Sequence, residues 1–257
     1  MRSAEELHLV LGLIENGLND CEIARLTGIP RRTVLDWRHG RGRKRDVREP
    51  GSGTCPRCRW KCLPLAESQE RGYAYLLGQY LGDGSISTHP KAVHRLRIFG
   101  DSRYVEIAAE ITRAMQIVVP NNIVRSDRHR VHNLVVVSAY SRLWPCLFPQ
   151  HGAGAKHTRP IALVDWQSAI TARHPERFIR GLIHSDGCRS TNTIRGKNKV
   201  YRYPRYQFCN ASDDIRRIFS DHLDLLGIPW RQMNARTISV ARREAVARLD
   251  EFVGPKT

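Results

Sequence analysis

The dipeptide Asp-Gly occurs only twice in the chain, at Asp83-Gly84 and Asp186-Gly187. Each pair ends an apolar run with helical spacing, LLGQYLGDG in the first case and IRGLIHSDG in the second. In each run a small residue stands five positions before the Asp and another stands directly before it: Gly78 and Gly82, then Gly181 and Ser185. Small residues four positions apart share one helix face. Two such helices are therefore expected to pack unusually closely.

If the two helices pack through these faces, Asp83 and Asp186 approach each other in the last helical turns. A carboxylate at a helix C-terminus faces the negative end of the helix dipole, which costs about 0.3–1 kcal/mol. Like charges in a partly dry site raise a pKa or recruit a cation. Magnesium takes a few carboxylate oxygens and keeps several waters, so the repeated pair predicts divalent-metal binding. Gly84 and Gly187 are expected in the left-handed conformation that often ends a helix.

These two runs resemble the signature motifs of the single-chain LAGLIDADG homing endonucleases. The resemblance covers residues 68–257 and implies a sequence-specific endonuclease that hydrolyses both strands of duplex DNA with Mg²⁺ or Mn²⁺. It implies that Asp83 and Asp186 are catalytic metal ligands, joined by the backbone carbonyls of Gly82 and Ser185. Three motif residues are unusual for the family, although none stands at a metal-ligand position: Gln79, Arg180 and His184.

A lysine near the metals typically stabilises charge in this family. Lys156 ends the Gly-rich HGAGAK segment after the first repeat, and Lys256 lies in FVGPK at a comparable place after the second. We expect both to be catalytic, the alternative being that they are surface lysines.

The hydrophobic pattern after each motif indicates the same order of elements. The first repeat predicts strands at 96–99, 122–124 and 134–138 and a helix at 101–115. The second predicts two strands within 188–209, helices at 212–226 and 244–252, and strands at 230–233 and 237–240. We therefore expect an α+β fold of tandem αββαββα repeats related by a pseudo-two-fold. The expected domains are a helix-turn-helix (1–46), a linker (47–67), the first repeat (68–160) and the second (161–257).

The 257 residues have a net charge of +17 and a pI near 10.2. Residues 1–50 contain 10 basic and 8 acidic side chains, residues 51–160 contain 15 and 7, and residues 161–257 contain 17 and 10. The excess therefore lies in the two repeats, which predicts a polyanionic partner, most commonly nucleic acid, and the family resemblance implies double-stranded DNA. The expected contacts, mostly to phosphates, are Arg95, Arg97, Arg125, Arg128, Arg130, Arg189, Arg195, Lys197, Lys199, Arg202 and Arg205.

The segment CEIARLTGIPRRTVLDW resembles the helix-turn-helix of resolvases, invertases and transposases. Asn19 or Asp20 is expected to cap the middle helix, and Gly28 to make the turn. The third helix would lie in the major groove and point its arginines outward. Its expected DNA contacts are Arg31, Arg32 and Thr33, with Arg38 also outward and Arg41 and Arg43 in a basic arm or linker that follows. The alternative is a three-helix packing module that does not bind DNA.

Cys55, Cys58 and Cys62 are candidate zinc ligands, because Cys55 and Cys58 form a CxxC pair. A CxxC pair normally supplies two of the four ligands, and no second pair follows. The alternative is a rigid linker with free thiols.

No apolar run is long enough to span a membrane. The segment MRSAEELHLV lacks a signal-peptide pattern, so we expect a cytoplasmic, nucleoid-associated protein. We expect a monomer with internal pseudo-symmetry. Two other hypotheses remain: a non-catalytic transcription regulator on a LAGLIDADG scaffold, and a recombinase-like protein suggested by the N-terminal segment alone.

Overall fold

The computed structural model describes residues 4–39, 64–129, 133–195, 199–254 and 256. Their contacts divide the chain into two compact units, residues 1–54 and 55–257. Most of the expected linker at 47–67 lies outside the described residues. None of the helices in the described part of the chain has the length and apolarity that a membrane crossing needs.

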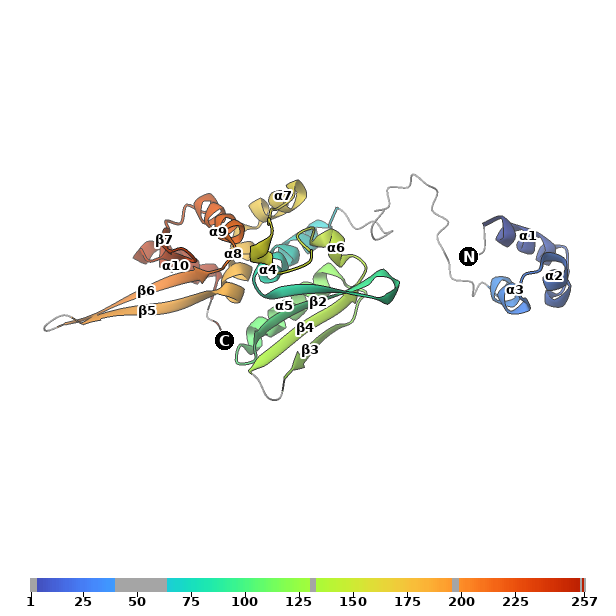
Figure 1. Cartoon of the computed structure of the whole chain (residues 1–257), viewed down its shortest axis with the longest axis horizontal. Coiled ribbons are helices and arrows are strands. Elements are labelled where there is room, and N and C mark those ends of the chain that lie inside the picture. Colours follow the sequence, from blue (N-terminus) through green and yellow to red (C-terminus); the bar gives the residue numbers. More distant parts are fainter. Residues whose placement is uncertain (1–3, 40–63, 130–132, 196–198, 255, 257) are drawn as a thin grey trace. The chain divides into compact units, whose positions relative to one another are not determined.

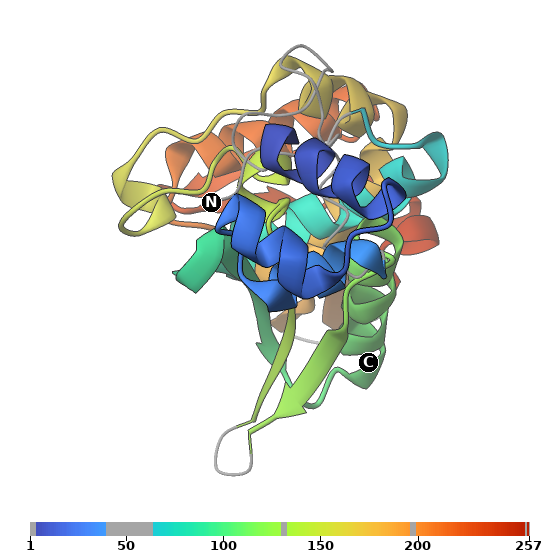
Figure 2. The same cartoon turned by 90° about the vertical axis from the view of Figure 1, so that its right-hand side faces the viewer.

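The N-terminal unit is a bundle of three short helices (blue in Figures 1 and 2), α1 (Ala4–Glu15), α2 (Asp20–Thr27) and α3 (Arg31–Arg38). Its buried core consists of Val10, Ile23, Ile29 and Val34.

Asn19 caps α2: its side chain accepts a hydrogen bond from the backbone N–H of Glu22, while the Glu22 carboxylate accepts one from the N–H of Asn19. The three expected helices and the turn at Gly28, which has φ 70°, are therefore present.

Arg38 does not point outward as expected. Its Nε donates to the Asp20 carboxylate at 2.6 Å, and its Nη2 donates to the backbone oxygen of Leu18 at 2.6 Å. The residue lies in the last turn of α3, where the bundle places it against the start of α2. Arg38 therefore connects α3 to the start of α2 and the turn before it.

The first repeat contains α4 (Glu67–Asp83), β1 (Gly84–His89), the 3₁₀ turn η1 (Pro90–Ala92), β2 (Val93–Asp101), α5 (Val105–Val118), β3 (Val124–Arg128), β4 (Leu134–Ser141) and the one-turn α6 (Trp144–Leu147). A connection with η2 (Lys156–Thr158) and α7 (Asp165–Arg173) follows. The second repeat contains α8 (Pro175–Asp186), β5 (Gly187–Arg195), β6 (Val200–Cys209), α9 (Asp213–Leu225), β7 (Arg231–Asn234), β8 (Thr237–Val240) and α10 (Arg243–Phe252).

The two repeats have the same topology. The sheets run in the orders β1-β2-β4-β3 and β5-β6-β8-β7, and every strand pair is antiparallel. The α+β fold of two αββαββα halves is therefore confirmed. The helix expected at 101–115 begins later, because the Asp101 side chain accepts from the N–H of Arg103 and holds residues 101–104 in a turn.

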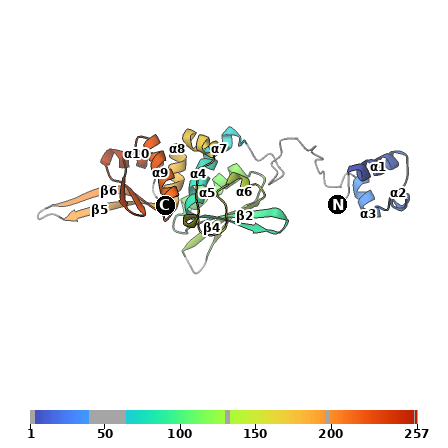
Figure 3. The same ribbon diagram turned by 45° about the horizontal axis from the view of Figure 1, so that its top comes forward.

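Helices α4 and α8 lie side by side between the two sheets (Figures 1 and 3) and pack together more extensively than any other pair of helices. One hydrophobic core contains residues of both repeats, with α4 buried from Tyr73 to Leu81. A Cβ added to Gly78 would lie 2.6 Å from the backbone oxygen of Phe178. A Cβ added to Gly181 would overlap the backbone oxygen of Tyr75. The expected close contact through small residues is therefore present.

The glycines that follow the two acids do not have the expected left-handed conformation. Gly84 has φ −89° and ψ 148°, and Gly187 has φ −103° and ψ 166°, because each helix passes directly into a strand. They are glycines for a steric reason. A Cβ added to Gly84 would lie 2.5 Å from the Cα of Tyr80, and a Cβ added to Gly187 would lie 2.8 Å from the Cα of Ile183.

We expect Gly181→Ala to lower the free energy of unfolding by about 2 kcal/mol, because overpacking outweighs the higher helix propensity of alanine. Urea denaturation measures the change. Gly100→Ala is the control, because its new methyl group would meet only a Val135 methyl at 3.6 Å. Equal stability of the two variants would show that close helix packing is not what requires glycine at position 181.

Candidate active site

Asp83 and Asp186 are the last residues of α4 and α8, and the packing of these helices brings the two acids together. A Cβ added to Gly82 would lie 2.9 Å from Oδ2 of Asp186 and would overlap Oγ of Ser185. The Asp186 carboxylate therefore lies directly against the backbone that precedes Asp83. Gly82 is required at this point because any side chain would separate the two acids.

Both acids are held where ionisation is costly. Burial and, to a smaller extent, the negative charge of Asp186 raise the pKa of Asp83 to about 6, against the opposing charges of Lys256 and Lys156. Burial also raises the pKa of Asp186, although a hydrogen bond from Asn210 opposes the effect. Two acids that repel each other at the C-terminal ends of two helices form a strongly negative site.

A lysine lies beside each acid. Lys156 Nζ donates to the backbone oxygens of Gly82 at 3.0 Å and Gly84 at 2.7 Å. Lys256 Nζ donates to the backbone oxygen of Ser185 at 3.3 Å. Because Gly82 and Ser185 hold equivalent places in the two motifs, the two lysines are equivalent as well.

Both amines are shifted toward the neutral form. Burial lowers the pKa of Lys156 to about 8 and also lowers the pKa of Lys256, while the charges of Asp83 and Asp186 oppose both shifts. The carbonyls of Gly82 and Ser185, which we expect to bind metal, each accept a lysine hydrogen bond. A carbonyl oxygen has two lone pairs, so this hydrogen bond leaves one of them for a cation.

Asn210 is a site residue that the sequence did not indicate. Its Nδ2 donates to Oδ2 of Asp186 at 2.5 Å, and its Oδ1 accepts from the N–H of Ser212 at the start of α9. The strand pairs Gly84–Ile98 and Gly187–Phe208 are equivalent, so the residue that corresponds to Asn210 in the first repeat is Gly100. Asp186 thus has an amide partner that the equivalent position, a glycine, does not supply to Asp83.

The donor set of the site fits a hard divalent cation. Carboxylate oxygens are ligands that Mg²⁺ and Mn²⁺ prefer. The part of the chain that the structure describes contains no cluster of three or more His, Cys, Asp or Glu side chains suited to a metal. With Asp83 and Asp186 as the acidic ligands, the remaining ligands of a bound ion would be backbone carbonyls, water and the oxygens of a bound anion.

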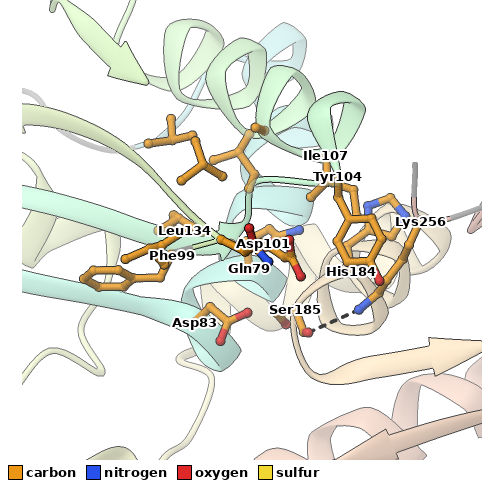
Figure 4. Close-up of a pocket in the computed structure, with 17 residues that line it drawn as sticks. Gln79, Asp83, Phe99, Asp101, Tyr104, Ile107, Leu134, His184, Ser185 and Lys256 are labelled. Atoms are coloured by element: carbon orange, nitrogen blue, oxygen red, sulfur yellow. Dashed lines mark hydrogen bonds between the residues drawn. The ribbon is translucent and has the colours of Figure 1, made fainter. Parts of the chain in front are cut away.

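A cavity of about 340 Å³ opens beside this site, as Figure 4 shows. Asp83, Ser185 and Lys256 line one side, together with Gln79 and His184, and the other side is lined mainly by apolar residues of β2, β4 and α5, such as Ile107. The cavity therefore gives the Asp83 and Lys256 side chains space in which to move.

In the first sheet, Leu96 and Ile98 face the core, so the neighbouring residues of β2 point to the opposite, open face. Arg95 and Arg97 lie there, and Arg125 joins them because it and Arg97 are both paired with Ser138 of β4. Arg128 lies on the helix-covered side, where its Nη2 donates to the Ser102 oxygen. The structure thus gathers three of the expected arginines on the open face and separates the fourth.

In the second sheet, Tyr206 and Phe208 face the core and Arg205 points to the open face. Arg189 pairs with Tyr206 and forms an ion pair with Asp250 of α10 at 2.7 Å, so it lies on the helix-covered side. Three further expected contacts lie exposed on the outer part of the β5–β6 hairpin: Arg195, Lys199 and Arg202.

Arg95 and Arg205 occupy equivalent positions in the two sheets. Arg95 is opposite Ser87 and Arg205 is opposite Ser190, each at the third residue from the motif glycine. The Nε of both arginines is buried without a hydrogen-bond partner. The pseudo-symmetry of the repeats therefore extends to Arg95 and Arg205, each of which has a buried Nε–H group that donates no hydrogen bond.

In the N-terminal unit, Arg31 and Arg32 are exposed at the start of α3 and Thr33 is half-buried beside them. The following expected residues lie outside the described residues: Arg41, Arg43, Cys55, Cys58, Cys62, Arg130 and Lys197.

No family model and no curated protein matches the chain. Several solved structures are similar in fold. I-DmoI in complex with DNA and Mn has a TM-score of 0.49 and 16% identity, covering 72% of this chain and 98% of I-DmoI. The LAGLIDADG meganuclease I-AabMI bound to uncleaved DNA has a TM-score of 0.45 and 9% identity, covering 70% and 82%. A variant of I-SmaMI has a TM-score of 0.46 and 8% identity, covering 71% and 85%.

We expect Asp83→Asn to stabilise the metal-free protein at pH 8. The folded pKa of Asp83, about 6, lies above its ordinary value of 3.8, so stability is lost as the pH rises from about 4 to about 6. Removing the charge should raise the free energy of unfolding by about 3 kcal/mol at pH 8, and by only about 1 kcal/mol at pH 4.5, where the folded carboxyl is still protonated.

Urea denaturation in EDTA at both pH values measures this effect. Asp186→Asn should gain less, because Asn210 then loses a charged acceptor. Equal stability of wild type and Asp83→Asn at pH 8 would contradict a costly carboxylate pair.

Proposed function

We propose that the chain is a sequence-specific endonuclease of the LAGLIDADG homing type that hydrolyses double-stranded DNA with Mg²⁺ or Mn²⁺. The observation that supports this most directly is the meeting of Asp83 and Asp186 at the ends of two packed helices, each acid beside a lysine. Stability alone does not account for an arrangement that raises the pKa of both carboxyls. A site that binds a cation does.

The chain's own residues would divide the work as follows. Asp83 and Asp186 hold the cation, which when bound supplies an activated water and neutralises charge on the phosphate. Lys156 and Lys256 each donate a hydrogen bond to a backbone carbonyl of one motif. From there their ammonium groups can turn and donate hydrogen bonds to phosphate oxygens. Because the pKa of Lys156 is about 8, its amine holds or releases a proton near neutral pH.

The sheets would supply the grip on DNA. Arg95, Arg97 and Arg125 present positive charge on the open face of the first sheet, and Arg205 does so on the second. Buried Nε groups without partners at Arg95 and Arg205 are donors that a phosphate or a base edge would satisfy.

The N-terminal unit would add site choice. Its capped α2, its turn at Gly28 and its exposed Arg31 and Arg32 at the start of α3 fit a helix-turn-helix whose third helix enters the major groove. This unit has little net charge, so its contribution is selectivity more than general attraction.

A supercoiled plasmid library with randomised inserts, incubated with Mg²⁺, tests the endonuclease. We expect wild type to linearise a subset of plasmids and EDTA to stop it. Asp83→Asn and Asp186→Asn should each slow cleavage by at least about 1,000-fold while DNA binding persists, because each removes one half of the cation site. Selective binding without cleavage by wild type would replace this proposal with the regulator.

The role of α3 is tested with Arg32→Ala, with the exposed Arg25→Ala of α2 as the charge-matched control. We expect Arg32→Ala to weaken binding to the selected target by about 10-fold, the cost of one base or phosphate contact, and Arg25→Ala to have a much smaller effect. Competition binding at fixed salt measures both. Equal affinities of the two variants would count against a recognition helix.

A further inference from the structure

The short segment after α10 contains Lys256, and its described residues form neither helix nor strand. Specific side-chain contacts must therefore hold this lysine in place. We call Phe252, the last residue of α10, together with Val253, Gly254 and Lys256, the C-terminal strap. Its backbone oxygens are bound by side chains of α8, the helix that ends in Asp186.

Arg180 makes the larger part of this connection. Its Nη1 donates to the backbone oxygens of Phe252, at 2.9 Å, and Val253. Its Nε and Nη2 donate to the Glu110 carboxylate of α5 at distances of 2.8–3.1 Å. One guanidinium thus connects the first repeat, the second motif helix and the strap.

His184 binds the same strap from the next turn of α8. Its Nε2 lies 3.0 Å from the Val253 oxygen, which can only accept, so Nε2 must be the protonated nitrogen. Nδ1 is then an acceptor for the Tyr75 hydroxyl at 3.0 Å, and that hydroxyl accepts from Gln79 Nε2 at 3.0 Å. The hydrogen bonds therefore run in one order: Gln79 donates to Tyr75, Tyr75 donates to His184, and His184 donates to Val253. This order fixes the orientation of the imidazole ring against the strap.

Gly254 completes the turn toward the acids. It has φ 69°, the left-handed region that favours glycine, and a Cβ there would lie 3.1 Å from Arg180 Nη1. After this turn Lys256 Nζ reaches the Ser185 oxygen at 3.3 Å, as the dashed line in Figure 4 shows. The strap contacts and the lysine contact both lie on the last two turns of α8.

We propose that Arg180 and His184 are positioning residues that hold the C-terminal strap and thereby place the Lys256 amine beside Asp83 and Asp186. They are two of the motif residues that are unusual for the resembled family, and Gln79 belongs to the same hydrogen-bonded chain. The catalytic meaning of this placement rests on the proposed endonuclease function. The placement itself is measurable without it.

The test measures the reactivity of individual lysines in the full-length protein. Trace labelling with acetic anhydride, followed by mass spectrometry, gives the acetylation rate of Lys256, with Lys156 as the internal reference in the same sample. We expect Arg180→Met to raise the rate at Lys256 by at least about 5-fold, because the freed strap exposes the amine, and to leave Lys156 unchanged.

Arg177→Met is the matched control. Arg177 lies on the same helix and forms an ion pair with the same Glu110 carboxylate at 2.8 Å, and none of its described contacts is to the strap. Arg180→Lys is a milder second variant that keeps a positive charge for Glu110 with fewer donors for the strap. It should raise the Lys256 rate to an intermediate value, and it decides the test if Arg180→Met does not fold.

Cleavage supplies a second measurement. Arg180→Met should lower the single-turnover rate by about 10- to 100-fold without changing DNA affinity, and should lower it no further when Lys256→Met is already present. Equal Lys256 labelling in Arg180→Met and Arg177→Met, or a full additional loss in the double variant, would overturn the positioning role. If wild type cleaves no DNA, the function proposal fails while the labelling result still decides the placement.

Discussion

The structure depends on one contact, the passage of α4 against α8 at Gly78 and Gly181. With no side chain between them, the backbones approach until a methyl group at either position would meet a carbonyl oxygen of the other helix. Helices this close must also bring their last residues together, and those residues are Asp83 and Asp186. The close packing that stabilises the core therefore brings two carboxylates together at the helix ends, where their ionisation is unfavourable. The pKa values of both acids are raised for this reason.

The chain offsets this cost locally with cations. The carbonyl oxygens in the last turn of a helix have no partner within the helix. Here Lys156 donates to the Gly82 oxygen and Lys256 to the Ser185 oxygen, so each lysine satisfies an unpaired carbonyl and reduces the repulsion between the acids. These lysines lose some of their own proton affinity through burial. The two lysines therefore partly compensate the acids while being themselves held in an environment that disfavours their charge.

The sequence predicted the repeat, the order of elements and the convergence of the acids, because each depends on local spacing. The sequence did not predict which sheet face each arginine lies on, because strand register determines that. Period-two alternation shows which residues share a face, but only strand pairing shows that Arg128 and Arg189 lie on the helix-covered sides while Arg95 and Arg205 lie on the open ones. Asn210 was missed because its contact with Asp186 joins residues from different elements. Gly84 and Gly187 were expected in the left-handed conformation, whereas they are extended and have no room for a Cβ against the preceding helical turn.

The two halves share one backbone plan but not one chemistry. Asp186 has an amide donor in Asn210, whereas the equivalent position beside Asp83 is Gly100. Lys156 is the first residue of the 3₁₀ turn η2, whereas Lys256 depends on a strap that Arg180 and His184 hold. A homodimer would make both halves identical by symmetry. A single chain is free to adjust each acid and lysine separately, so the two strands of a bound duplex would meet different partners.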